Sequence, residues 1–184
     1  MIIFRRLERK KLNIRRLICL IMCLSALLTS LSGCAAKTAP EKVVSALCEN
    51  EIGLVGGRIY YFSAHEGDEG YLPDDMLLSL YGFDRGLSGL SDGAIYLSGF
   101  YHPCEFAVFV CESTSTAEDV ALCLRNRIDT LRKSAALAAP FCDMTVEEYR
   151  AYIESAAVVI SGRYVALIIS SDAPSAKRAF YRAV

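Results

Sequence analysis

The feature that most constrains this 184-residue chain is an apolar run without charge, residues 17–31. Its 15 residues fall short of the roughly 20 apolar residues that a comfortable membrane-spanning helix needs. Residues 1–16 carry seven Lys or Arg and a single acid, Glu8. A basic segment followed by a short apolar run is typical of a secretory signal, which is removed from the mature protein. We therefore expect the fold to be formed by the residues that follow this leader.

The last residue of the apolar run begins the sequence Leu31-Ser32-Gly33-Cys34. This sequence resembles the lipobox of bacterial lipoproteins, in which an aliphatic residue and two small residues precede a cysteine. The resemblance implies transfer of a diacylglyceryl group to the Cys34 thiol and cleavage between Gly33 and Cys34. It also implies attachment to the extracytoplasmic face of the cell membrane through acyl chains such as palmitate. Two acyl chains anchor a protein stably, since burial contributes about 0.8 kcal/mol per CH₂.

The lipobox divides the chain into three expected parts. These are a signal peptide over residues 1–33, a lipidated tether over residues 34–40 and a single exported domain over residues 41–184. The alternative is an uncleaved N-terminal anchor, with the lipobox pattern a coincidence. Both alternatives predict the same topology, because a positively charged flank is retained on the cytoplasmic side and the domain then lies outside.

The part of the chain after the leader is acidic. Removing the leader's seven basic residues and one acid from the totals of 20 Lys or Arg and 21 Asp or Glu leaves 13 basic and 20 acidic residues. The resulting formal charge of −7 does not provide the clustered Lys and Arg that bind nucleic acid. We therefore exclude a nucleic-acid partner.

The periodicity of apolar residues predicts a domain of helices and strands. The expected strands are residues 94–101, 104–112, 156–160 and 164–170, with 59–62 either a short strand or the start of a loop. The expected helices are residues 41–50, 74–81, 115–138 and 145–154 and a last helix capped by Asp172. Two helix starts have the spacing of a capping box, Ser115 with Glu118 and Thr145 with Glu148. Residues 86–93, rich in Gly and Ser, are expected to form a loop.

The order strand, strand, helix occurs twice in the second half of the chain. The predicted fold is therefore α+β, with a four-stranded antiparallel sheet made of two ββα units and helices packed over one face. An internal duplication explains the two units, and the independent occurrence of similar amphipathic segments explains them equally well.

Several segments resemble a known family. They are residues 105–110 (EFAVFV), 116–120 (TAEDV), 124–127 (LRNR), Tyr149, and the hairpin strands 158–160 (VVI) and 164–169 (YVALII). Over residues 41–184 the chain resembles a family of small Gram-positive lipoproteins known as domain of unknown function 4358. The resemblance implies a short exported α+β domain behind a lipobox and implies no activity. Glu105 and Arg127 match the family's pattern and are a candidate charge pair.

The sequence from Gly89 to Gly93 matches the G-x-S-x-G pattern of hydrolases, with Ser91 at its centre. That motif requires a strand before the serine and a helix after it, so that the hydroxyl projects beside an oxyanion hole. Here a loop is expected before Ser91 and a strand after it, and only His65 and His102 are present as candidate bases. The pattern therefore favours a Gly/Ser turn.

Five cysteines follow Cys34, and an odd number cannot all pair within one chain. They are Cys48, Cys104, Cys111, Cys123 and Cys142. Cys104 and Cys111 are seven residues apart on one expected strand, hence on opposite faces, and cannot bond to each other there. We expect most of the five to be buried thiols, with one disulfide allowed and its partners open. Cys104 with His102 is a candidate nucleophile and base, which requires the two side chains to lie within hydrogen-bond reach.

The run from His65 to Gly70 is polar and acidic. Its side chains His65, Glu66, Asp68 and Glu69 offer ligands for a cation such as calcium. Their spacing is not that of an EF-hand loop, and no H-E-x-x-H motif is present. We interpret the run as a solvated acidic turn.

These patterns favour an extracytoplasmic lipoprotein that is not an enzyme. We expect it to bind an envelope protein or a small ligand, and to be held to the membrane by lipid on Cys34. The alternative is a small surface hydrolase or thiol enzyme that uses Ser91 or Cys104 with a histidine, and a structural role in the envelope is a third hypothesis. We assign no catalytic, cofactor-binding or metal-binding residue, so Cys34 is the one predicted site residue.

Overall fold

The computed structural model describes residues 38–51, 54, 56–99 and 102–184. The leader and Cys34 lie outside these residues, so the predicted signal peptide and lipidation site are not part of the fold described below. None of the helices in the described part of the chain has the length and apolarity that a membrane span requires.

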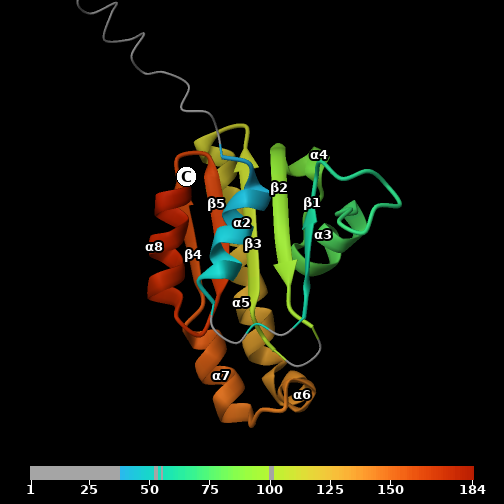
Figure 1. The fold of residues 1–184 in the computed structure, drawn as a ribbon. Coiled ribbons are helices and arrows are strands. Elements are labelled where there is room, and N and C mark those ends of the chain that lie inside the picture. The colour runs from blue at the N-terminus through green and yellow to red at the C-terminus, as the bar shows by residue number, and fades with distance from the viewer. Residues whose placement is uncertain (1–37, 52–53, 55, 100–101) are drawn as a thin grey trace, which may run out of the picture. The chain divides into compact units, whose positions relative to one another are not determined.

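The centre of the domain is an antiparallel sheet (Figure 1). Its strands are β1 (Arg58–Tyr61), β2 (Leu90–Leu97), β3 (Glu105–Cys111), β4 (Ala157–Ser161) and β5 (Tyr164–Ile169). Their order in the sheet is β1-β2-β3-β5-β4, and each neighbouring pair is antiparallel. The α+β class and the antiparallel sheet are thus confirmed.

The predicted number of four strands is wrong, because β1 adds a fifth strand at one edge. Its four residues pair with β2 from Arg58↔Leu97 to Tyr61↔Ala94. A strand this short has no clear alternation of its own, and its pairing with β2 provides the backbone hydrogen bonds that a lone segment lacks. Residues 86–93 are also not a loop throughout, since a short helix precedes β2 and the strand starts at Leu90.

Helices surround the sheet. They are α2 (Pro40–Glu49), α3 (Asp74–Tyr81), α4 (Arg85–Ser88), α5 (Thr114–Lys133), α6 (Ala135–Ala138), α7 (Val146–Glu154), α8 (Ala173–Ala183) and a 3₁₀ turn, η1 (Ala139–Cys142). The capping box of Thr145 and Glu148 and the Asp172 cap are confirmed. The cap of α5 is Ser113, whose hydroxyl accepts from the Thr116 N–H at 3.0 Å. The predicted Ser115–Glu118 box is therefore wrong by two residues.

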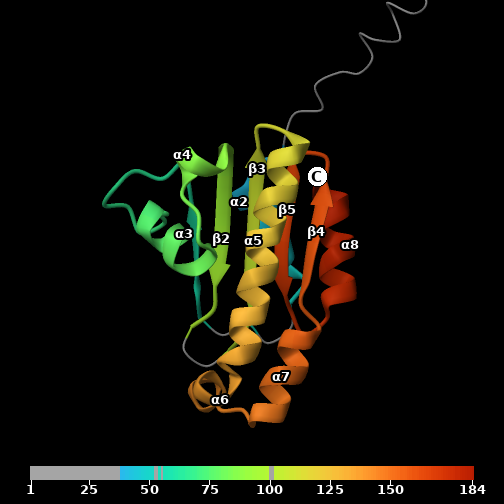
Figure 2. The same ribbon diagram turned by 180° about the vertical axis from the view of Figure 1, so that it is seen from behind.

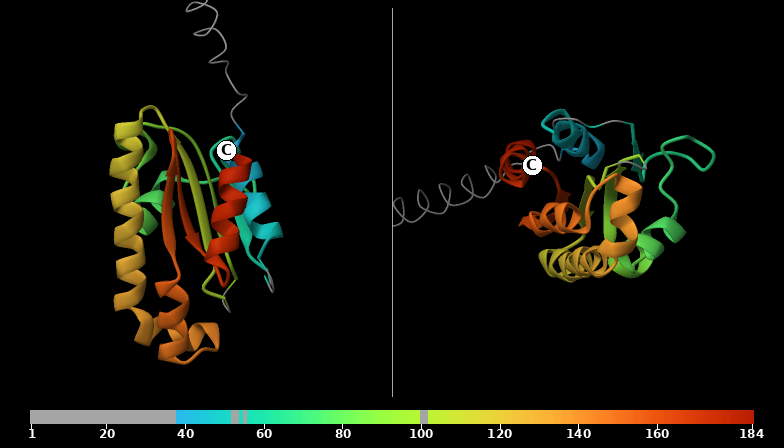
Figure 3. Two further views of the ribbon diagram at one scale, coloured as in Figure 1. Left: turned by 90° about the vertical axis from the view of Figure 1, so that its left-hand side faces the viewer. Right: turned by 90° about the horizontal axis from the view of Figure 1, so that it is seen from below.

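Both faces of the sheet are covered, which corrects the prediction that helices cover one face (Figures 2 and 3). One face packs against α3, α5 and α7 around Phe109 and Leu124. The other packs against α2 and α8 around Phe106 and Phe180. The reason lies in β3, in which every residue is buried. A central strand that is apolar on both sides needs a helical layer on each side.

The two ββα units are not related by a twofold axis that includes their helices. In an antiparallel sheet, the twofold axis that relates β2-β3 to β4-β5 is perpendicular to the sheet, and it would leave both following helices on the same face. Instead, α5 packs on one face and α8 on the other. The two units share an order of elements and differ in handedness.

Candidate functional site

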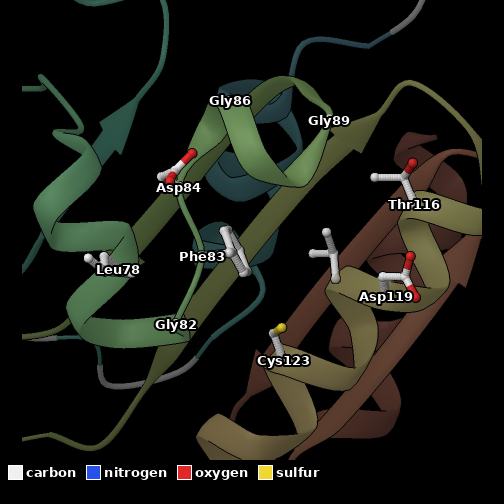
Figure 4. A pocket seen from close by; sticks show the side chains of 10 residues that line it. Leu78, Gly82, Phe83, Asp84, Gly86, Gly89, Thr116, Asp119 and Cys123 are labelled. Carbon is white, nitrogen blue, oxygen red and sulfur yellow. The ribbon is translucent and has the colours of Figure 1, made fainter.

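A cleft of about 500 Å³ opens between the first half of α5 and the segment that joins α3 to β2. Figure 4 shows Thr116, Asp119 and Cys123 of α5 opposite Leu78 of α3 and opposite Phe83 and Asp84 of the segment that follows α3. The remaining lining residues are Gly82, Gly86, Gly89 and Val120.

The wall opposite α5 is held in place by aromatic packing. Gly82 ends α3 with a left-handed φ of 78°, which glycine adopts without strain. The chain then places the Phe83 ring in the core. This ring stacks on Tyr81 with the ring centres 5.7 Å apart and lies edge-on to Phe109 with the ring centres 5.3 Å apart. These contacts hold the segment against the sheet, so the wall is part of the core and is preformed.

Two glycines keep the cleft open. Gly89 has φ +61°, and a Cβ there would lie 3.3 Å from Thr116 Cγ2 and 3.5 Å from Glu112 Oε2. Gly86 has no such backbone constraint, and the nearest atom to a Cβ there would be Asp84 Oδ1 at 3.5 Å. The absence of side chains at both positions leaves room between α4 and the start of α5.

The polar lining of the cleft is acidic. Asp84 and Asp119 contribute carboxylates and Thr116 a hydroxyl, and none of the described lining residues has a basic side chain. Arg85, which lies next to Asp84 in the sequence, contacts other residues: its Nε lies 3.0 Å from Asp74 Oδ1, and its guanidinium lies 4.2 Å from the centre of the Phe62 ring. The cleft therefore combines negative charge with an apolar floor.

The predicted nucleophile Ser91 does not meet a histidine. It lies in β2 beside a register shift between Leu90 and Asp92, and its hydroxyl donates to the Val110 carbonyl at 3.0 Å. His102 follows the other end of β2, about 20 Å away at some 3.3 Å per strand residue. The hydroxyl takes part in the irregular strand pairing. The predicted Gly/Ser turn is wrong for Leu90 to Gly93, which lie in β2.

His65 lies in an exposed turn. Its side chain is 91% exposed, and its Nδ1 is 3.8 Å from Asp68 Oδ2. Within the residues that the structure describes, no three His, Cys, Asp or Glu side chains are grouped so as to hold a metal ion.

The structure brings the His102 ring to the backbone of Cys104. The Cys104 backbone N–H donates to His102 Nδ1 at 3.2 Å. The side chain of Cys104 is buried, and burial raises the pKa of its thiol above the usual range, with the Glu51 carboxylate adding to the effect. A thiol with a raised pKa is protonated at neutral pH and is a poor nucleophile.

None of the five described cysteines forms a disulfide. Cys111 is buried on the opposite face of β3 from Cys104, as predicted from their spacing. Burial raises the pKa of Cys48 to about 12 and that of Cys111 to about 11. Cys123 is partly exposed and lines the cleft.

Glu105 and Arg127 form the predicted charge pair between β3 and α5. Arg127 Nη2 donates to Glu105 Oε2 at 2.8 Å, and its Nε lies 3.3 Å from the same oxygen. The side chains are 6% and 19% exposed, respectively. Burial, followed by the nearby Glu105 carboxylate, holds the pKa of Tyr81 well above its usual range.

One buried carboxylate has no counterpart in the sequence analysis. Glu51 accepts hydrogen bonds from the hydroxyls of Tyr152 at 3.2 Å and Ser171 at 2.7 Å, from the Ser171 N–H at 2.9 Å, and from the Ser170 hydroxyl. Its partners are 101 to 120 residues away along the chain, so no local pattern could have revealed them. The carboxylate ties the end of α2 to α7 and to the β5–α8 connection, and it does not line the cleft.

Comparisons with known proteins give no relative, since no family model, curated protein or solved structure matches this chain. The resemblance to the lipoprotein family therefore stays a prediction.

Proposed function

We propose that this protein is a bacterial lipoprotein held to the extracytoplasmic face of the cell membrane by diacylglycerol on Cys34. The basic leader, the short apolar run and Leu31-Ser32-Gly33-Cys34 support the proposal. The compact domain begins at Thr38, so cleavage before Cys34 removes none of the described core residues. Residues 1–33 would act as the signal peptide and 34–40 as the tether.

We further propose that the domain is a binding or accessory module of the envelope, with the cleft beside α5 as its binding site. The observation that carries this proposal is the preformed cleft of about 500 Å³, a size typical of small-molecule sites. The residues that would support the enzyme alternative are placed less favourably, because the Ser91 hydroxyl is engaged by Val110 and the Cys104 thiol is buried.

The lipoprotein proposal is tested on the full chain in its own membrane by labelling with an alkyne analogue of palmitate. We expect the native chain to take up label and to have an intact mass that begins at Cys34 and includes diacylglycerol. Cys34→Ser should lose the label and accumulate with the leader attached. Cys23→Ser, a matched change within the apolar run, should keep the label.

An unlabelled native chain whose mass includes Met1 would contradict the proposal and identify residues 17–31 as an uncleaved anchor. Equal labelling of the Cys34→Ser and native chains would contradict it as well, because lipid would then be carried by another residue.

A further inference from the structure

We propose that the cleft beside α5 binds a small cationic amphiphile, namely a primary ammonium group on an apolar stem, at the surface of the membrane. The chemistry of the ligand follows from the cleft alone. Its location at the membrane rests on the proposed function, because it requires lipid on Cys34.

The charge of the lining selects a cation. Asp119 and Thr116 lie one turn apart on α5 and provide the carboxylate and the hydroxyl for the ligand, on the wall opposite Asp84 (Figure 4). Carboxylate and hydroxyl oxygens accept hydrogen bonds, and an ammonium group provides three donors and no acceptor. An anionic ligand would meet like charges here, since Glu112 Oε2 lies close to Gly89 at the mouth of the cleft.

The rest of the lining selects an apolar stem. Phe83 and Val120 are core residues whose surfaces form the floor, and Cys123 contributes its sulfur. Leu78, which is 57% exposed, extends the apolar surface outward along α3. A stem of several methylene groups would be removed from water here, which favours binding in proportion to the apolar surface that is buried. The neutral part of the ligand therefore contributes to binding as well as the charge.

The cleft lies at the same end of the sheet as the start of the domain. The Tyr164 hydroxyl donates to the Thr38 carbonyl at 2.9 Å, and Tyr164 pairs with Val110 at the end of β3. Just beyond that strand end, the Glu112 N–H donates to the Gly89 carbonyl at 2.9 Å, at the mouth of the cleft. Figures 1 and 2 show the starts of α2 and α5 at this one end, on opposite faces of the sheet.

The tether then brings that end to the bilayer. Only residues 35–37 separate Cys34 from Thr38, and a chain of this length reaches at most about 14 Å at 3.6 Å per residue. With lipid on Cys34, the end of the sheet that carries Thr38 and the cleft must lie near the lipid headgroups. Anionic headgroups concentrate cations at the membrane surface, so an acidic cleft at this end is placed where cationic amphiphiles accumulate.

The test uses the mature lipidated protein in nanodiscs, with the methyl groups of Val120 observed by NMR. The probes are hexylammonium, hexanol and hexanoate, which share a stem and differ in charge. We expect hexylammonium to shift the Val120 signals to saturation, with affinity about fivefold above that of hexanol, which is the upper end of what an exposed ion pair contributes. Hexanoate should bind more weakly than hexanol.

Asp119→Asn should weaken hexylammonium binding about fivefold and leave hexanol binding unchanged. Glu118→Gln, the matched change at the neighbouring exposed residue that is not part of the lining, should leave both unchanged. Signals from the opposite face of the sheet report whether each variant is folded. Equal or tighter binding of hexanoate, or no effect of Asp119→Asn, would overturn the proposed ligand chemistry. Saturation by a lysine-containing peptide with no response to hexylammonium would also overturn it, in favour of a protein partner.

A second experiment tests whether the cleft end of the domain lies near the membrane, by adding a lipid with a gadolinium headgroup to the nanodisc. Amide signals at Gly162, in the β4–β5 turn, should broaden much more than those at Leu137, in α6 at the other end of the domain (Figure 1). Equal broadening at the two sites would contradict the proposed position of the cleft near the membrane, without affecting the proposed ligand chemistry. The intact mass of the same sample reports lipid on Cys34, so a failure of the proposed function is seen separately from a failure of this inference.

Discussion

We predict that loss of the buried Glu105–Arg127 ion pair lowers the free energy of unfolding. Arg127→Met removes the guanidinium and keeps much of the side-chain volume, which leaves the Glu105 carboxylate, 6% exposed, without its partner. Breaking a buried pair on one side costs about 3–5 kcal/mol. Because Arg127 is 19% exposed and water can partly replace it, we expect the lower end, about 3 kcal/mol. The corresponding fall in Tm is roughly 6–12 °C at 2–4 °C per kcal/mol.

The assay is urea unfolding of the exported chain, followed by far-UV circular dichroism. The urea midpoint should fall in Arg127→Met without a change in the m value, because a change confined to the native state leaves the exposed surface of the unfolded chain the same. Arg125→Met is the matched control on the exposed side of α5, and we expect its free energy of unfolding to change by no more than about 0.5 kcal/mol.

The double variant Glu105→Leu with Arg127→Met distinguishes the cost of an unpaired buried charge from the cost of altered packing. It removes both charges and places two apolar side chains between β3 and α5. We expect it to recover most of the stability lost in the single variant, since apolar replacement of a buried pair is often neutral. A single variant within 1 kcal/mol of the native chain, or a double variant as unstable as the single one, would refute the reasoning from burial.

Three further outcomes are expected. Iodoacetamide at pH 8 should alkylate Cys123 well before Cys104, as read by peptide mass spectrometry, because Cys104 is buried and its pKa is raised; faster reaction of Cys104 would contradict its placement. Gly89→Ala should lower the free energy of unfolding in urea by about 1 kcal/mol, because alanine is strained at φ +61°, and an unchanged midpoint would argue against that conformation. Hydrogen bonds from Thr145 lower the pKa of Glu148 below its ordinary 4.5, so the carboxylate stabilises α7 above that pH and less as the pH falls through the lowered pKa. The difference in urea midpoint between the native chain and Glu148→Gln should therefore shrink on acidification, and a constant difference would rule out this role.

The acidic cleft could be predicted only in part. The loop expected for residues 86–93 includes Gly86 and Gly89, and the helix expected for residues 115–138 includes Thr116, Asp119 and Cys123. What brings them opposite Phe83 is the packing of α3 and α5 on the same face of the sheet, and no pattern within either helix encodes that contact. The G-x-S-x-G motif shows the same limit, because the partner of the Ser91 hydroxyl is Val110, 19 residues away on the next strand.

The sequence by itself determined the features that depend on near neighbours. The capping box at Thr145, the Asp172 cap and the end of α3 at Gly82 are satisfied within a few residues of the helix terminus, so local chemistry suffices for them. The opposite faces of Cys104 and Cys111 follow in the same way from the alternation of a strand.

Tertiary structure decided what depends on contacts between distant segments. The edge strand β1 exists because β2 provides its hydrogen bonds, and α8 covers the opposite face from α5 because β3 is apolar on both sides. Glu51 is buried because Tyr152, Ser170 and Ser171 converge on it from more than 100 residues away. Burial of a charge requires donors at the correct positions in space, and only the packed domain provides them.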